Sequence, residues 1–288
     1  MLWSLIEGAS DIRTMLVELL LSIPACLFAI SAHEAAHGWM AERCGDSTAR
    51  YLGRITLNPV KHFDPIGFGM MMLFGFGWAR PIPVNPRNYR RYRRDDLLVS
   101  MAGILMNLLI AFISALLIFI AAGAALATLP ETISYGKPFI MDYMGERCLI
   151  TADNTYCEIS LIFRYACGGS IEDILFVPVF GQVAGYLYRI FVYSVILNLS
   201  LAFFNLIPIP PLDGYHLLND LILRKPLFAS IDTQRLTRIL LLILVGSDYI
   251  FPRIGLGRGI LSRISGFLLN NVLQGLGIAA GAVYNLFV

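Results

Sequence analysis

The sequence predicts an all-α integral membrane protein, a bundle of four to six spanning helices, and three observations support this fold class. The mean hydropathy is +0.68. Only 15% of the 288 residues are charged, whereas a soluble globular domain carries about 25%. Apolar runs of roughly 20 residues, long enough to cross a bilayer, recur along the chain. We expect one membrane-embedded domain over residues 1–288, without a soluble second domain.

The apolar runs define the order of the spans. Three clear spans are expected, at residues 15–40, 97–127 and 179–207. The proline-rich stretch 208–211 ends the third span, because proline lacks an amide donor and restricts the residue before it. Apolar segments near 236–251 and 266–287 predict one or two further spans. The core therefore covers about residues 15–220, and C-terminal membrane segments follow at about 236–288.

Two segments between the first and second spans differ from a plain spanning helix. In residues 49–57, every second position from Tyr51 to Leu57 belongs to an alternating pattern that predicts a short strand or hairpin. Residues 66–85 are apolar but contain four glycines and two prolines. So many helix breakers favour a re-entrant hairpin, sheltered by protein or by a water-filled cavity.

Basic residues are concentrated in one part of the chain. Ten of the 22 Lys and Arg residues fall within 43–94, whereas 128–178 holds three basic residues against seven acidic ones. Because Lys and Arg in short loops mark the cytoplasmic side, we expect 43–95 to be cytoplasmic and 128–178 external. The run RNYRRYRRDD is then a solvated flank of a membrane span, and nucleic-acid binding is not expected.

The cysteines agree with this orientation. Cys148, Cys157 and Cys167 lie in the predicted external loop, where an oxidising compartment permits one disulfide. Cys26 and Cys44 lie in or beside the first span. No cysteine spacing typical of a zinc site is present.

The first chemical motif is HEAAH at 33–37, near the end of the first span. Side chains at i and i+4 share one face of a helix, so His33 and His37 can bind one metal ion. Glu34 can stand on the open side of the metal and take a proton from water. A chance match is the alternative, but a carboxylate and two imidazoles beside a long apolar run are costly unless they have partners. We therefore interpret the cluster as a metal site.

A third ligand is needed, because a catalytic zinc ion usually has three protein ligands and one open position. Asp213, in NLIPIPPLDG at 205–214, follows the third span and is the natural candidate. If the first and third spans both run toward the cytoplasm, Asp213 arrives at the same membrane depth as His33 and His37. The alternative is that Asp213 only caps the next helix, in a Pro-Pro-Asp-Gly turn.

Together, these motifs resemble the site-2 protease family of intramembrane zinc metalloproteases, peptidase family M50. The matching segments, in the expected order, are HEAAHG at 33–38, NPVKHFDPIG at 58–67, FGWARPIPVNPRNYR at 76–90, AGILMN at 102–107 and NLIPIPPLDG at 205–214. The resemblance covers most of residues 30–220. Ile104 stands where the family often has proline. The loop at 128–178 is too short for a PDZ module, so the chain resembles a compact member without PDZ or CBS domains.

The resemblance implies a three-helix catalytic core in which His33, His37 and Asp213 hold zinc. It also implies Glu34 as the general base and Asn107 as a polar residue near the reacting carbonyl. The implied substrate is a transmembrane protein, cut in or next to its membrane segment. We expect the plasma membrane of a prokaryote, with the active site toward the cytoplasm.

Two other classes of function stay open on the sequence, a membrane zinc transporter and a non-catalytic membrane scaffold. A transporter would not need Glu34 between the ligands and usually lines a path with several ionisable groups. A scaffold would not need the complete set of metal ligands. Among the other polar residues, His62 and His216 are expected to be structural, and Asn205 is a candidate for lining the cavity.

Overall fold

The computed structural model describes residues 12–74, 78–127, 139–143, 146–150 and 177–223, together with five single positions between 236 and 247. The chain divides into two compact units. Unit 1 comprises Met1–Ala111 and Ile196–Phe267, and unit 2 comprises Phe112–Val195 and Leu268–Val288. All the residues predicted for the metal site belong to unit 1.

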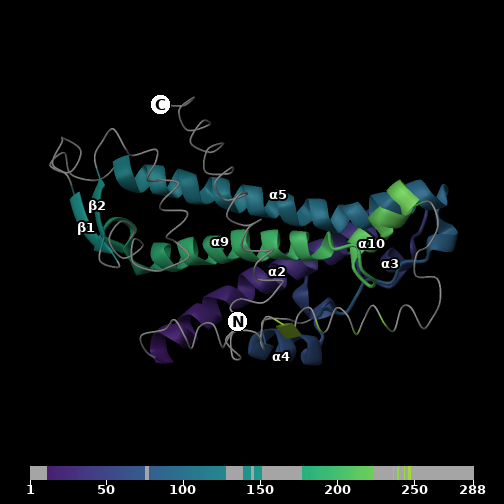
Figure 1. Cartoon of the computed structure of the whole chain (residues 1–288), viewed down its shortest axis with the longest axis horizontal. Coiled ribbons are helices and arrows are strands. Elements are labelled where there is room, and N and C mark those ends of the chain that lie inside the picture. The colour runs from purple at the N-terminus through teal and green to yellow at the C-terminus, as the bar shows by residue number, and fades with distance from the viewer. Residues whose placement is uncertain are drawn as a thin grey trace. The chain divides into compact units, whose positions relative to one another are not determined.

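Three long helices carry the membrane character of the described residues (Figure 1). They are α2 Ile12–Cys44, α5 Tyr92–Ala127 and α9 Val177–Asn205. Within them, the stretches long and apolar enough to cross a membrane are Leu16–Cys44, Tyr92–Ile118 and Tyr186–Asn205. These are the three spans expected from the sequence, and the all-α membrane class is confirmed. Apart from five single positions, the predicted C-terminal spans lie outside the described residues, so the total of four to six stays a prediction, as does a single domain.

Small residues form the buried face of α2. Ala25, Ala29, Ala32 and Ala36 recur at helical spacing and are at most 4% exposed. In a membrane, lipid is as apolar as the helices, so helices associate mainly by close packing. Small side chains allow their backbones to approach closely. Phe28, on another face of the same helix, is 44% exposed. Such an outward apolar side chain suits contact with lipid.

The segment that follows α2 is helical where a strand was predicted. Helix α3, Thr48–Tyr51, occupies its start, and the amide of Arg54 donates back to the carbonyl of Ala49. Gly53 closes this turn with a φ of +60°, a left-handed conformation that glycine adopts without strain. The strand predicted over 49–57 is therefore wrong. Local hydrogen bonds around a fully buried Ala49 outweigh the alternating pattern.

Three short helices follow in the same segment. They are η1 Pro59–Lys61, α4 Pro65–Phe74 and η2 Pro86–Asn88. Each begins with proline, and the side chain before it caps the first turn: Asn58 accepts from Val60 N, Asp64 from Gly67 N and Asn85 from Arg87 N. Proline at the first helical position after Asn or Asp is a strong helix start. Residues 78–85 form neither helix nor strand, so the re-entrant hairpin predicted over 66–85 is partly helix and stays unconfirmed.

Asp46 fixes this segment to the end of α2. Its side chain is fully buried, and it accepts hydrogen bonds from Asn85 N at 2.6 Å and from Asn88 Nδ2 at 2.8 Å. Burial alone would raise the pKa of Asp46. The hydrogen bonds from Asn85, Thr48 and Asn88 outweigh burial and hold the pKa below its usual value. An ionised Asp46 therefore stabilises the position of residues 85–88.

The chain turns sharply after α9 and enters a short helix, α10 Asp213–Leu218, which η4 Asn219–Leu223 continues. A methyl group on Gly214 would lie 2.3 Å from the carbonyl oxygen of Leu206. Only glycine permits such an approach to a backbone atom. Gly214 therefore brings the first turn of α10, and Asp213 with it, against the end of α9.

Unit 2 contains an antiparallel hairpin of two strands, β1 Phe139–Tyr143 and β2 Glu146–Ile150, with Tyr143 opposite Glu146. The sequence did not predict this hairpin, which falls in the stretch expected to be external. Ser114 of α5 and Ser194 of α9 share a buried hydrogen bond of 2.8 Å in the same unit. The side chains of Cys148, Cys157 and Cys167 lie outside the described residues, so the expected disulfide stays a prediction. Cys26 and Cys44 are buried, and neither forms a disulfide.

Candidate metal centre

The predicted ligands come together in unit 1. His33 and His37 lie one turn apart on α2, and they are 6% and 8% exposed. Their Nε2 atoms are 3.0 Å apart, and each lies 3.3 Å from Oδ2 of Asp213 at the start of α10. The three ligand atoms lie within 4.8 Å of one another, and no other group of His, Cys, Asp or Glu in the described part of the chain meets that condition.

A hydrogen bond to the backbone sets the tautomer of His37. Its Nδ1 lies 2.7 Å from the carbonyl oxygen of Val99 on α5. A carbonyl can only accept, so Nδ1 carries the proton and Nε2 keeps a free lone pair. That lone pair is directed to the side of His33 and Asp213. A ligand histidine held by its second nitrogen is the arrangement that zinc sites use, so the donor set fits zinc.

Asp213 supplies the negative charge of the ligand set. Burial alone would raise its pKa, but the contacts with His33 and His37 outweigh burial and hold the pKa of Asp213 below its usual range. The carboxylate is therefore ionised at neutral pH. Two neutral imidazoles and one carboxylate are a common set of three ligands in catalytic zinc sites.

Gly103 of α5 leaves the space that the two imidazoles occupy. A methyl group at this position would lie 2.5 Å from His37 Nε2 and 2.7 Å from His33 Cε1. Atoms at these distances overlap, so any larger residue would displace at least one ligand. Helix α5 therefore supports the site in two ways. Gly103 leaves space for both imidazoles, and the carbonyl of Val99 accepts a hydrogen bond from His37.

Glu34 lies next to the first ligand and is held by the backbone of another segment. Its Oε2 accepts a hydrogen bond of 2.7 Å from the amide of Ile82. Ile82 is 7% exposed and lies between two prolines. A carboxylate has about four lone-pair positions, so this single bond orients Glu34 and leaves it able to accept a proton.

Asn107 lies on α5 one turn after Gly103, and it is fully buried. Neither its Oδ1 nor its Nδ2 has a hydrogen-bond partner among the described residues. A buried amide without partners is costly, of the order of 1–3 kcal/mol for each unsatisfied group.

A second ionisable pair lies beside α10. Nδ1 of His216 is 2.8 Å from Oδ2 of Asp96, at the start of α5, and Figure 1 shows α10 beside that end of α5. The hydrogen bond to Asp96 raises the pKa of His216, although burial opposes it. His216 lies one turn after Asp213, so the pair anchors the helix that carries the third ligand.

His62 and Asn205 have contacts of their own. His62 is 2% exposed, and its Nε2 lies 2.9 Å from the carbonyl oxygen of Thr56. Asn205 donates from Nδ2 to Leu201 O, at 3.1 Å, in its own helix. Both side chains thus stabilise local structure, and neither belongs to the ligand group of His33, His37 and Asp213.

Three supporting contacts were not found by sequence reasoning. Val99 and Ile82 act through backbone atoms, which leave no residue-type signal. Asp96 does leave a signal, because two adjacent aspartates at the start of an apolar span are unusual. The run of basic residues before them indicated only a solvated flank.

Two buried histidines on a helix that can cross a membrane, joined by an aspartate from a short helix, are typical of a membrane metalloenzyme. The profile of Peptidase family M50 matches residues 22–246. The Bacillus subtilis (strain 168) protein named "Putative zinc metalloprotease YwhC" is 31% identical over 236 residues, which cover 81% of this chain and 84% of that protein. No solved structure matches the chain at a comparable level. The chain belongs to peptidase family M50, a family of membrane metalloproteases, and its cofactor is zinc.

Proposed function

We propose that this protein is an intramembrane zinc metalloprotease, which hydrolyses peptide bonds in or next to the transmembrane segments of membrane-protein substrates. The observation that carries the proposal is the convergence of Asp213, from the short helix α10, with His33 and His37 on a helix long enough to cross a membrane, where Glu34 lies beside them. The family membership supports the protease activity. The membrane span that carries His33 and His37 supports a substrate within the bilayer.

Zinc would be held by His33, His37 and Asp213. Zinc in such a site supplies a Lewis acid for the scissile carbonyl and lowers the pKa of water toward ~7. Glu34 accepts a proton from the attacking water on a carboxylate oxygen and then gives it to the nitrogen of the leaving amine. Ile82 N, bonded to Oε2, keeps that carboxylate in one orientation.

Asn107 is the proposed donor to the developing oxyanion. Its Nδ2 is buried without a partner, one helical turn after the glycine that contacts both histidines. A donor that is already in place costs no reorganisation when charge develops on the carbonyl oxygen. The same donor would bond less strongly to the neutral ground-state carbonyl, which is the condition for catalysis.

A helical substrate must unwind before attack, because its carbonyls are otherwise bonded within the helix. Residues 78–85 have an irregular backbone and include the amide that holds Glu34. An extended substrate could add backbone hydrogen bonds along this segment, in the manner of an added β-strand. We place this segment and the metal centre on the cytoplasmic side of a prokaryotic plasma membrane, because basic residues are concentrated within 43–94.

The test combines cleavage and metal content in one preparation. Glu34→Gln retains the shape of the side chain and all three ligands, but an amide cannot accept the water's proton. General-base catalysis contributes typically 10²–10⁴-fold, so cleavage of a co-reconstituted single-span substrate should fall at least about 100-fold. Zinc should remain near one equivalent per chain.

Three results would contradict the proposal. Undiminished cleavage by Glu34→Gln would exclude the mechanism. Zinc flux through proteoliposomes that depends on Glu34, without cleavage of any substrate, would favour a transporter. A chain that binds zinc and substrate but cleaves nothing would be a scaffold.

A further inference from the structure

The protein surface at the start of α5 is strongly basic. Five arginines lie between positions 87 and 94, and all of them are exposed. Arg93 is close enough to Asp220 to act on its charge. The side chains of the other four form no hydrogen bond or ion pair with the described residues. We call these four the basic patch: Arg87, Arg90, Arg91 and Arg94.

The two acidic residues that follow the basic patch do not form ion pairs with it. Asp95 and Asp96 are 5% and 7% exposed. Asp95 Oδ2 accepts a 2.7 Å hydrogen bond from the backbone amide of Arg91, and Asp96 Oδ2 is bonded to Nδ1 of His216. Both carboxylates are thus used within the protein, and the guanidinium groups of the patch stay available for a ligand outside it.

The basic patch is held against the end of α2. The amide of Arg90 donates to the carbonyl of Cys44, the last residue of α2, at 3.1 Å. Arg90 and Arg94 both lie close enough to Cys44 to act on it electrostatically. The buried Asp46 fixes residues 85–88 through two hydrogen bonds, at 2.6 Å and 2.8 Å. The backbone of the patch is therefore preformed, which reduces the cost of binding a ligand.

Aromatic side chains place the basic patch at the depth of the lipid headgroups. The stretch of α5 that can cross a membrane begins at Tyr92, within the patch, and Tyr92 is 59% exposed. On α2, Trp39 is 44% exposed, and Cζ of Arg43 lies 3.8 Å from the centre of its ring. Tryptophan and tyrosine are enriched where a membrane meets water. Both helices thus present an exposed aromatic residue and arginines at the end where they meet.

Phosphate is the ligand group that such a surface fits. A guanidinium donates two parallel hydrogen bonds to a phosphate and remains charged at any physiological pH. Basic clusters directly beside a membrane span attract anionic lipids, whose phosphates lie at the same depth. A nucleic acid would have to approach this surface at headgroup depth, where anionic lipids repel it. The position of the patch therefore favours a lipid over a nucleic acid.

We infer that the basic patch is a binding site for the headgroup of an anionic phospholipid, such as phosphatidylglycerol. Arg90 and Arg94, beside the end of α2, bind the phosphate, and Arg87 and Arg91 add positive charge. A zwitterionic lipid such as phosphatidylcholine has the same phosphate but no net charge, so it binds more weakly. The inference goes beyond the proposed protease function and does not depend on it.

The test uses Trp39 as a local reporter in the full-length protein. Trp3→Phe and Trp78→Phe leave Trp39 as the single tryptophan of the chain. The protein is reconstituted in mixed vesicles of phosphatidylcholine and phosphatidylglycerol, and one of the two lipids carries a nitroxide near the headgroup end of its acyl chain. A nitroxide quenches nearby tryptophan fluorescence, so the two series give the relative binding constant of phosphatidylglycerol over phosphatidylcholine beside Trp39.

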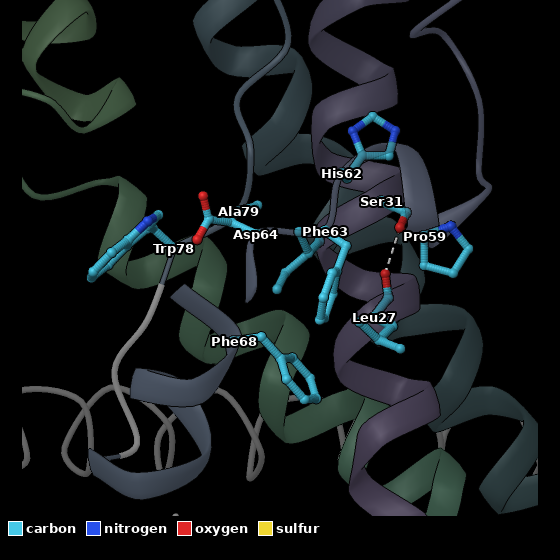
Figure 2. A pocket seen from close by; sticks show the side chains of 10 residues that line it. Leu27, Ser31, Pro59, His62, Phe63, Asp64, Phe68, Trp78 and Ala79 are labelled. Carbon is cyan, nitrogen blue, oxygen red and sulfur yellow. Dashed lines mark hydrogen bonds between the residues drawn. The ribbon is translucent and has the colours of Figure 1, made fainter. Parts of the chain in front are cut away.

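Two controls show whether an effect is local. Arg13→Gln makes the same change as Arg90→Gln at an exposed arginine of α2, 26 positions before Trp39, or about 39 Å along the helix. The second control is a protein with Trp78 as its single tryptophan. Figure 2 shows Trp78 among the side chains that line a small pocket, with Phe63 and Phe68, and no arginine of the basic patch lines that pocket.

The expected result is a preference for phosphatidylglycerol that depends on the patch. Each basic residue near the membrane surface is worth roughly a fivefold change in the binding of anionic lipid. Arg90→Gln and Arg94→Gln should each lower the relative binding constant by about that factor, and the double variant should lower it at least about tenfold. Lysine at both positions retains the charge and should retain most of the preference. Arg13→Gln should leave the constant unchanged, and the Trp78 reporter should respond to none of these variants.

Several outcomes would overturn the site. One is equal quenching by the two lipids in the protein with all its arginines, and another is a preference that survives in the Arg90→Gln/Arg94→Gln double variant. An equal loss in Arg13→Gln or at the Trp78 reporter would show an effect of overall charge. Binding of a short RNA that depends on Arg90, without any lipid preference, would assign the patch to nucleic acid.

A second measurement applies if a tryptophan variant does not fold, as judged by zinc content and the thermal midpoint. The protein with its three tryptophans and its Arg90→Gln/Arg94→Gln variant are purified in detergent from the same membranes, and the retained phospholipids are identified by mass spectrometry. Phosphatidylglycerol retained by the first and lost from the second supports the site. Equal retention by both proteins overturns it.

Discussion

The amide of Ile82 donates a 2.7 Å hydrogen bond to Oε2 of Glu34, across 48 positions of sequence. This bond joins the helix that carries two metal ligands to a segment without regular secondary structure. A carboxylate that must move a proton has to be held in one orientation, and a backbone donor can hold it without adding a second titratable group. The segment 78–85 thus contributes to the catalytic site through its main chain.

Removing that donor should reduce turnover without loss of metal. Ile82→Pro deletes the N–H, and the neighbouring Pro83 already restricts position 82 to extended conformations that proline also adopts. We expect kcat to fall roughly tenfold, the effect of losing about 1.4 kcal/mol of transition-state stabilisation. Zinc content should be unchanged. Ile82→Val retains the N–H and serves as the control, and equal activity of the two variants would show that the bond does not orient Glu34.

Gly103 should tolerate no side chain. The methyl group of an alanine at this position would overlap His37 Nε2, at 2.5 Å. A coordinated imidazole cannot swing away without leaving the metal. Gly103→Ala should therefore lower zinc occupancy at least about tenfold and abolish cleavage, although alanine favours a helix by about 1 kcal/mol over glycine. Gly69→Ala is the control, because a methyl group there meets nothing within 4 Å. Metal analysis after gel filtration measures both, and full occupancy in Gly103→Ala would contradict the packing argument.

The sequence was sufficient for those parts of the protein that depend on residue type. Long apolar runs predicted the three spans, because crossing a bilayer has a simple requirement of length and hydropathy. The HEAAH spacing and Asp213 predicted three side chains that the fold brings within 4.8 Å. Here a helical repeat and the alternation of span direction were enough to place residues 176 positions apart together.

The contacts that hold those residues could not be predicted in the same way. Val99 acts through its carbonyl and Ile82 through its amide, and every residue except proline has both groups. The strand predicted over 49–57 was wrong because the pattern did not show that Asp46 accepts from Thr48 N at the first turn of α3. Hydrogen bonds of this kind depend on which loop lies nearby, and a single sequence carries little information about that.

Asp46 should make the stability of unit 1 depend on acid pH. Hydrogen bonds hold its folded pKa below its usual value, so its contribution is complete above about pH 4, the usual pKa of an unfolded Asp. The contribution is lost as the pH falls through the folded pKa. At pH 7, Asp46→Asn should destabilise the protein by about 1–3 kcal/mol, because Asn85 N loses its charged acceptor. Thermal unfolding in detergent between pH 3 and 7 compares the two proteins, and a constant difference over the whole range would exclude this linkage.

The cluster of His216, Asp96 and Asp220 should make stability depend on pH in the opposite direction, with stability lost as the pH rises. The bond to Asp96 raises the pKa of His216, and burial together with Asp96 raises the pKa of Asp220 to about 6. Both groups are more easily protonated in the folded protein, so both contribute stability at low pH that is lost as the pH rises through their folded pKa values. For His216, the contribution is complete below about pH 6.5, the usual pKa of histidine.

Asp96→Asn removes the negative charge that acts on both His216 and Asp220. His216→Gln removes the imidazole. The thermal midpoint of the wild type should exceed that of Asp96→Asn by more at pH 6 than at pH 9, because the charged bond to His216 forms only below its folded pKa. In a double-mutant cycle at pH 6, the two changes should not be additive, since the side chains are in direct contact. Zinc affinity, measured by competition with a chelator, should fall in each single variant, because α10 carries Asp213 one turn from this anchor. Additive effects on stability together with unchanged zinc affinity would show that the pair neither couples nor positions the third ligand.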